Sequence, residues 1–244
     1  KAIKNEKPDH VPAAPDMWEM VPVRLSGKPA IDVLIYKDPP IWKAQVDAYR
    51  YYGVDAFVPL VVPMEETSKA IVYKDDKKII VRSFQEDGSG ITWSPFVEVF
   101  RGQEPRAFVK AKSLGLPETH GKYEIVNPSY KKYGKEYYDD AKAYLGDDGV
   151  IFPMVSLPAL PIWEDEVLRY YDEPGVVLAE MEERGHNMMK QAETFLSWNP
   201  DGISIGNSGM MITNPPHIFR QIGLKWLEKL TKLAKEHGIP THLH

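Results

Sequence analysis

The sequence predicts an α/β fold built on parallel strands, of the TIM (β/α)8-barrel type but incomplete. Short apolar runs alternate with segments of helical periodicity, and this alternation is typical of βαβ units. The run DAFVPLVVP (55–63) is apolar almost throughout, as expected for a strand buried in a parallel sheet. The alternation is interrupted between residues 66 and 127, where β-rich segments follow one another without a helix.

Barrel-type strands are predicted at five places in the chain. They are residues 11–17, 55–62, 149–156, 201–206 and 239–244. A complete barrel has eight βα units, so we expect residues 1–244 to form one domain with about five of them. The last strand is expected to stop at His244 with backbone groups unpaired, and Lys1 falls in what resembles a helix tail. We therefore expect the protein to extend beyond these residues.

Helices are predicted between the strands from their ends and their periodicity. Residues 39–53 have prolines in the first turn and end at Gly53, and residues 173–198 begin near Pro174. The clearest helix is predicted over residues 214–238. We expect Asn214 to cap it, Gly238 to close it, and its buried stripe to comprise Ile218, Ile222, Trp226, Leu230 and Leu233.

Residues 66–127 are interpreted as an antiparallel β insertion. Within them, AIVYKDDKKIIVRSF (70–84) has two β-rich runs around Lys74-Asp75-Asp76-Lys77, which predicts a β-hairpin. The insertion interrupts the α/β scheme, and a small separate lobe is an equally good interpretation.

Composition excludes several classes of protein. The net charge is −5 and acids and bases are interspersed, so no basic stripe for nucleic acid is present. The chain has no cysteine, which excludes a disulfide-stapled scaffold. No apolar run approaches the roughly 18 residues that a membrane helix needs, and the charged first residues do not resemble a signal peptide. We expect a cytoplasmic protein that does not bind membranes.

His242 and His244 are the strongest candidates for chemistry. Residues two apart on a strand point to the same face, so both imidazoles are expected at the carboxyl end of the last strand. Two imidazoles on one face suit a metal, with zinc as the leading choice. One of them could instead act as an acid or base near neutral pH. A structural histidine satisfied by a neighbouring carboxylate or carbonyl is the third interpretation.

Glu19, Arg24 and Asn207 are further candidates at predicted strand ends. Glu19 could be a base, a metal ligand, a partner for Arg24 or simply a solvated charge. Asn207, with Ser208, could donate hydrogen bonds to a substrate or make the turn into the next helix.

Three stretches resemble the uroporphyrinogen decarboxylase superfamily. KPDHVPAAP resembles the family's opening segment, and YRYYGVDAFVPL resembles the strand after its first helix. The third stretch is DGISIGN followed by NPPHIFRQIGLKWLEKLTKLAKEHGIPTHLH, and it resembles a long family motif that leads into a strand ending in histidine. The resemblance implies a β/α barrel and covers most of the chain outside residues 66–135.

The resemblance implies one of two activities. The decarboxylases bind substrate carboxylates with arginines and hold the pyrroles with an aspartate. Here MWEMVPVRLSGK replaces the arginine-bearing segment, leaving Arg24, and FVPLVVP replaces the segment with the aspartate. The other members are methyltransferases that work with corrinoid proteins and commonly hold zinc through His-x-Cys. His244 matches that histidine, and the cysteine would lie two residues further on.

The sequence therefore favours a zinc-dependent methyltransferase that acts with a corrinoid protein on a small methyl donor or acceptor. His244, helped by His242, would bind zinc, and Glu19, Arg24 and Asn207 would position the substrate. The alternatives are a decarboxylase-type lyase acting on a tetrapyrrole or another carboxylated substrate, and a binding protein without catalysis. A homodimer is left open.

Overall fold

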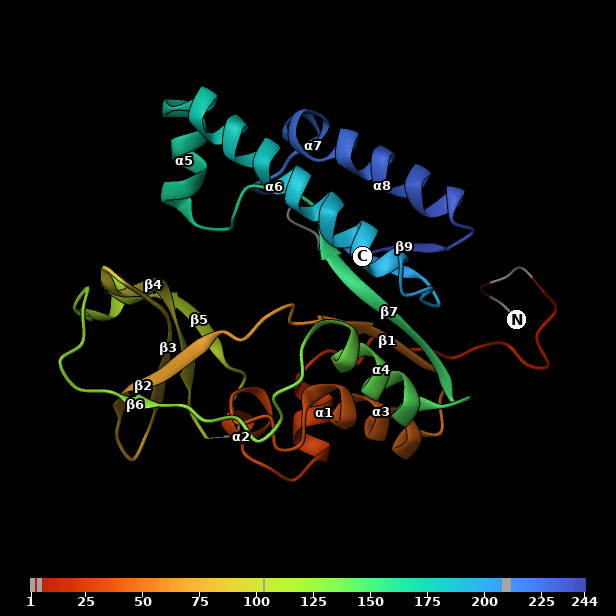
Figure 1. The fold of residues 1–244 in the computed structure, drawn as a ribbon, viewed down its shortest axis with the longest axis horizontal. Coiled ribbons are helices and arrows are strands. Elements are labelled where there is room, and N and C mark those ends of the chain that lie inside the picture. The colour runs from red at the N-terminus through yellow and green to blue at the C-terminus, as the bar shows by residue number, and fades with distance from the viewer. Residues whose placement is uncertain (1–2, 4–5, 103, 208–211) are drawn as a thin grey trace. The chain divides into compact units, whose positions relative to one another are not determined.

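The computed structural model describes residue 3 and residues 6–102, 104–207 and 212–244, and its fold is mixed α/β (Figure 1). The chain forms two compact units. Unit 1 comprises Lys1–Ala13, Phe57–Val62 and Gly149–His244, and unit 2 comprises Ala14–Ala56 and Pro63–Asp148. Unit 1 is therefore assembled from segments that are distant in sequence.

Unit 1 is built on an open sheet of four strands in the order β1-β7-β8-β9. The strands are β1 (Ala56–Leu60), β7 (Gly149–Ser156), β8 (Ile203–Gly206) and β9 (Thr241–Leu243). The pairs β7–β8 and β8–β9 are parallel, and Ser204 lies opposite Met154 on one side and opposite His242 on the other. Four of the five predicted strands are thus confirmed.

Helices connect the strands of unit 1 and cover one face of the sheet. β7 is followed by α5 (Glu164–Asp172) and α6 (Pro174–Leu196), and β8 is followed by α7 (Pro216–Ile222) and α8 (Leu224–Glu236). α6 contacts β7 and β8 and runs beside α8 (Figure 1). Alternate residues of these strands are almost inaccessible to solvent, as expected for strands covered by helices. They are Ile151, Val155, Ile203 and Ile205.

Unit 2 combines helices with an antiparallel sheet. Its helices are α1 (Met20–Leu25), α2 (Ala30–Leu34), α3 (Ile41–Tyr52) and α4 (Gly134–Leu145), with a 3-10 turn, η2 (Ala111–Leu114). The predicted end of α3 is confirmed, because Gly53 has a φ of 62° and stops the helix in the left-handed region. Val46, Ala48 and Tyr49 form the buried face of α3.

The antiparallel sheet has five strands in the order β5-β4-β3-β2-β6. They are β2 (Ser68–Lys74), β3 (Ile79–Asp87), β4 (Gly90–Phe100), β5 (Ala107–Lys110) and β6 (Glu124–Ile125). β2 and β3 pair with Ile71 opposite Val81, which confirms the predicted hairpin.

The strand predicted at residues 11–17 is wrong, because these residues form neither helix nor strand. Pro12 and Pro15 cannot donate backbone hydrogen bonds to a ladder, which is the physical reason. Tyr49 of α3 instead donates its hydroxyl to the carbonyl of Pro15 at 2.9 Å. Of the apolar residues in this segment only Met17 is buried, whereas Val11 is 88% exposed.

The single helix predicted over residues 214–238 is also wrong, because it is divided at Gly223 into α7 and α8. Asn214 does not cap α7. Its amide donates to and accepts from the backbone of Leu160, at 2.9 and 2.8 Å, and so fixes the loop after β7. The end of the segment is as predicted, since Gly238 follows α8 with a φ of 68°.

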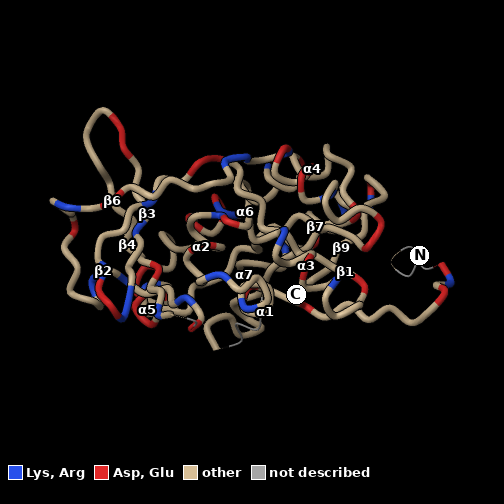
Figure 2. Tube along the Cα trace, turned by 90° about the horizontal axis from the view of Figure 1, so that it is seen from below, with Lys and Arg blue, Asp and Glu red and all other residues tan. Residues whose placement is uncertain are grey.

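Charged residues of both signs are interspersed along the trace of the chain (Figure 2). Within the described residues, no helix combines the length and the apolar character needed to cross a lipid bilayer.

Candidate functional site

One face of the unit 1 sheet carries the candidate site. The strand register places Met154, Ser204 and His242 side by side, and Phe152 and Gly202 one step earlier on the same face. Gly202 is required there, because a Cβ at this position would lie 2.1 Å from the Phe152 ring. The Phe152 ring therefore lies against the backbone at Gly202, directly before β8.

Phe57 and His242 meet across this face. Their ring centroids are 4.9 Å apart, and Phe57 also contacts Phe152 at 5.0 Å. β1 and β9 lie at opposite ends of the strand order, which in a flat sheet corresponds to about 14 Å from three strand spacings. Contact between their side chains indicates that this face of the sheet is concave.

His242 has one partner on the neighbouring strand β8 and another on β1. Its Nδ1 lies 3.4 Å from Oγ of Ser204, which is completely buried. A hydrogen bond at Nδ1 orients the ring and leaves Nε2 as the nitrogen that can bind a metal or a substrate. The Phe57 ring, at 4.9 Å between centroids, also limits rotation of the His242 ring.

His244 and Asn207 lie together at the carboxyl ends of β9 and β8. The backbone N–H of His244 donates to Ile205 at 3.0 Å, and the N–H of Asn207 donates to the carbonyl of His244 at 3.1 Å. The parallel ladder thus brings Asn207 beside the histidine pair. Carboxyl ends of parallel strands are where α/β proteins collect their reactive groups.

The two histidines fit part of a zinc site. Their ring centroids are 6.4 Å apart. Two imidazoles bonded to one tetrahedral zinc ion at about 2.0–2.1 Å hold their centroids about 5 Å apart, so the exposed His244 ring would have to move closer to His242. Among the described residues, no group of three or more His, Cys, Asp or Glu side chains could hold a metal. The described residues therefore offer at most these two ligands at this place.

Glu19 belongs to an ion-pair chain within unit 2. Both of its carboxylate oxygens accept from Arg106, and Arg106 also donates to Glu98 at 2.5 Å. Glu98 in turn accepts from Lys69 at 2.5 Å, and its side chain is 8% exposed. The carboxylate of Glu19 thus has a partner that sequence reasoning missed, because Arg106 lies 87 positions away.

Arg24 is exposed in the last turn of α1, and Ser208 lies outside the described residues. Glu19 and Arg24 are in unit 2, whereas Asn207, His242 and His244 are in unit 1. The structure brings the latter three together. The roles predicted for Glu19 and Arg24 stay predictions.

Sequence reasoning also missed Ser204 and Phe57 as neighbours of the histidines. The available signal was the alternation along DGISIG, where small residues at every second position leave room for larger side chains from neighbouring strands.

No protein-family model, curated protein or solved structure matches the chain.

Proposed function

We propose that this chain is a zinc-dependent methyltransferase of the uroporphyrinogen decarboxylase superfamily that works with a corrinoid protein. The observation that carries the proposal is the grouping of His242, His244 and Asn207 at the carboxyl ends of two parallel strands. The position of the pair agrees with the histidine-bearing strand of the family that the sequence resembles.

The β/α-barrel architecture belongs to the same proposal. The strand order β1-β7-β8-β9 follows the chain without reversing, as in a barrel and unlike a doubly wound sheet, whose order changes direction. The ring contact between Phe57 and His242 supports curvature toward the face that a barrel encloses. We interpret the four strands as an arc of such a barrel.

Each residue of the site has a defined task in this proposal. His242 and His244 hold the metal, and Ser204 orients His242 through Nδ1. Zinc, when bound, would supply Lewis acidity and lower the pKa of a thiol acceptor. Asn207 positions the substrate by hydrogen bonding, and the rings of Phe57 and Phe152 keep water from the floor of the site.

Metal analysis tests the zinc site. The purified protein, loaded with zinc and dialysed, is expected to retain about one equivalent, and His242→Ala or His244→Ala to lose most of it. His217→Ala is the matched control, because His217 is an exposed histidine of α7 and is not part of the sheet. Retention by the purified protein of less than about a tenth of an equivalent would contradict the metal role.

Activity assays separate the reaction classes. We expect the zinc-loaded protein to transfer the methyl group of methylcobalamin to one member of a panel of thiols, monitored by the change in the corrinoid spectrum. His244→Ala is expected to lower the rate at least about 100-fold, because the metal site is lost. Release of carbon dioxide from uroporphyrinogen, without methyl transfer, would favour the decarboxylase alternative.

A further inference from the structure

Unit 2 contains a cavity of about 230 Å³ that is separate from the histidine site. Its lining combines apolar side chains with two lysines. The apolar part includes Leu34, Ile35, Val126 and Pro128, and the polar part includes Lys37 and Lys69.

Backbone hydrogen bonds fix the walls of this cavity. The N–H of Val126 donates to the carbonyl of Lys69 at 2.9 Å, which joins two of the lining segments. The N–H of Gly134 donates to Pro63 at 2.8 Å, and the N–H of Ser129 donates to Tyr36 at 2.7 Å. Segments from four parts of unit 2 are therefore held in place, so the cavity is built into the fold.

The two lysines differ in how their charges are compensated. Lys69 donates to Glu98, which is almost fully buried. Lys37 has no ion pair among the described residues, and its ammonium lies 4.9 Å from the centroid of the Tyr133 ring. Burial lowers the pKa of Lys37, and the nearby charge of Lys69 lowers it further, against an opposing effect of Glu66. The ammonium of Lys37 thus lacks a close counter-ion.

We propose that this cavity binds a small organic monocarboxylate with a short apolar chain. Its carboxylate would accept hydrogen bonds from Lys37, which gives the half-buried ammonium a counter-ion. The apolar chain would pack against Ile35 and Val126. Glu65 and Glu66 are exposed at the rim and disfavour ligands with more than one negative charge.

A matched pair of ligands tests the charge requirement. Titration calorimetry with isovalerate is expected to show saturable binding, and the neutral isostere isovaleramide is expected to bind at least about 10-fold more weakly. Equal binding of the two compounds would overturn the proposal, as would the absence of isovalerate binding.

A matched pair of variants tests the residue. Lys37→Gln is expected to weaken isovalerate binding at least about 10-fold, because the ionic hydrogen bond is lost. Lys74→Gln, a change at an exposed lysine at the end of β2, is expected to leave the affinity unchanged. Thermal melting checks that both variants are folded. Equal affinity of the wild type and Lys37→Gln would overturn the assignment.

Chemical labelling supplies a readout that needs no variant. Acetic anhydride reacts with a lysine amine only when that amine is neutral. Mass spectrometry should therefore show that isovalerate slows the acetylation of Lys37 and that isovaleramide does not. Lys74 should be acetylated at the same rate with either compound. The proposal would be overturned if isovalerate slowed the acetylation of both lysines or of neither.

Discussion

Arg82 lies inside unit 2, with 5% of its surface exposed. Its guanidinium donates to the carbonyls of Ser94 and Pro117, at 2.7 and 2.8 Å, and lies 2.8 Å from Nε2 of His120. Since arginine can only donate, the Nε2 of His120 must be an unprotonated acceptor. Burial, followed by the charge of Arg82, lowers the pKa of His120.

We expect this contact to make the stability of unit 2 depend on pH. The pKa of His120 is lower in the folded state than its usual value of 6.5, so the unfolded state binds the proton first. Stability should therefore be complete above about pH 6.5 and decline as pH falls from there toward the folded-state pKa. Thermal melting between about pH 8 and 5 measures the decline.

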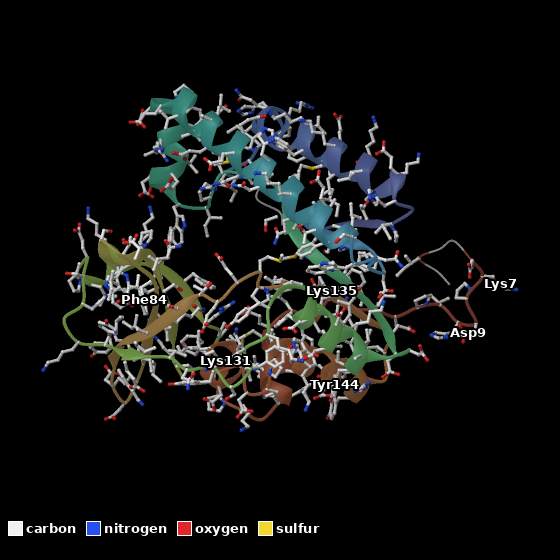
Figure 3. The ribbon with its side chains drawn as sticks, in the orientation of Figure 1. Lys7, Asp9, Phe84, Lys131, Lys135 and Tyr144 are labelled. Atoms are coloured by element: carbon white, nitrogen blue, oxygen red, sulfur yellow. The ribbon has the colours of Figure 1, made fainter. Side chains whose placement is uncertain are left out.

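His120→Gln is the matched variant for this prediction. A glutamine oxygen can still accept from Arg82 and does not titrate. The variant should lose less stability than the wild type over the same pH range. An equal loss of stability in the two proteins would show that His120 does not contribute to the pH dependence. The aromatic cluster around it includes Trp93 and Phe84, of which Figure 3 labels Phe84, and this cluster should remain packed in both proteins.

At the level of elements, α6 and α8 approach closely at Gly185. Gly185 of α6 faces the Trp226 ring, and a Cβ at residue 185 would lie 1.9 Å from it. Trp226 is 1% exposed, so the ring has no free space into which it could move. The contact explains why a glycine occurs within a long helix, where it is otherwise unfavourable.

Gly185→Ala should destabilise the protein by about 1–3 kcal/mol, because overpacking against Trp226 outweighs the better helix propensity of alanine. Gly175→Ala in the same helix is the control, since nothing lies within 4 Å of its added methyl group. That variant should be neutral or slightly stabilising. Denaturant unfolding measures the free energy of unfolding of each variant. Equal stability of Gly185→Ala and Gly175→Ala would contradict the packing argument.

At the level of the whole molecule, each unit has a core of its own. In unit 1, Leu160, Val177, Met181, Ile218 and Ile222 form one cluster. In unit 2, a larger cluster includes Val23, Ile31, Val81 and Val126. The chain passes from unit 1 into unit 2 twice, after Ala13 and after Val62, and it returns at Phe57 and at Gly149.

Separate cores predict a localised response to a core substitution. Gly185→Ala should speed amide hydrogen exchange in α6, α8, β7 and β8 of unit 1. Exchange in β2, β3 and β4 of unit 2 should remain at the wild-type rate. A uniform increase across both units would show that they open as a single cooperative block.

The sequence alone determined the elements whose evidence is local. The periodicity and end residues of α3 and α6, the apolar runs of the parallel strands and the β2–β3 hairpin are each encoded within a few residues. The placement of His242 in the last strand and of His244 directly after it is of the same kind. Their metal-binding role stays a prediction, because spacing on a strand does not specify what completes the site.

Only the tertiary structure decided the contacts between residues distant in sequence. The partner of Glu19 is 87 positions away, and the cavity around Lys37 is assembled from four parts of unit 2. Asn214 fits the pattern of a helix cap, yet its amide bonds to Leu160. Local patterns constrain the backbone conformation of a segment. The partner of a polar side chain depends instead on which distant segments pack beside it, and short-range periodicity does not specify those segments.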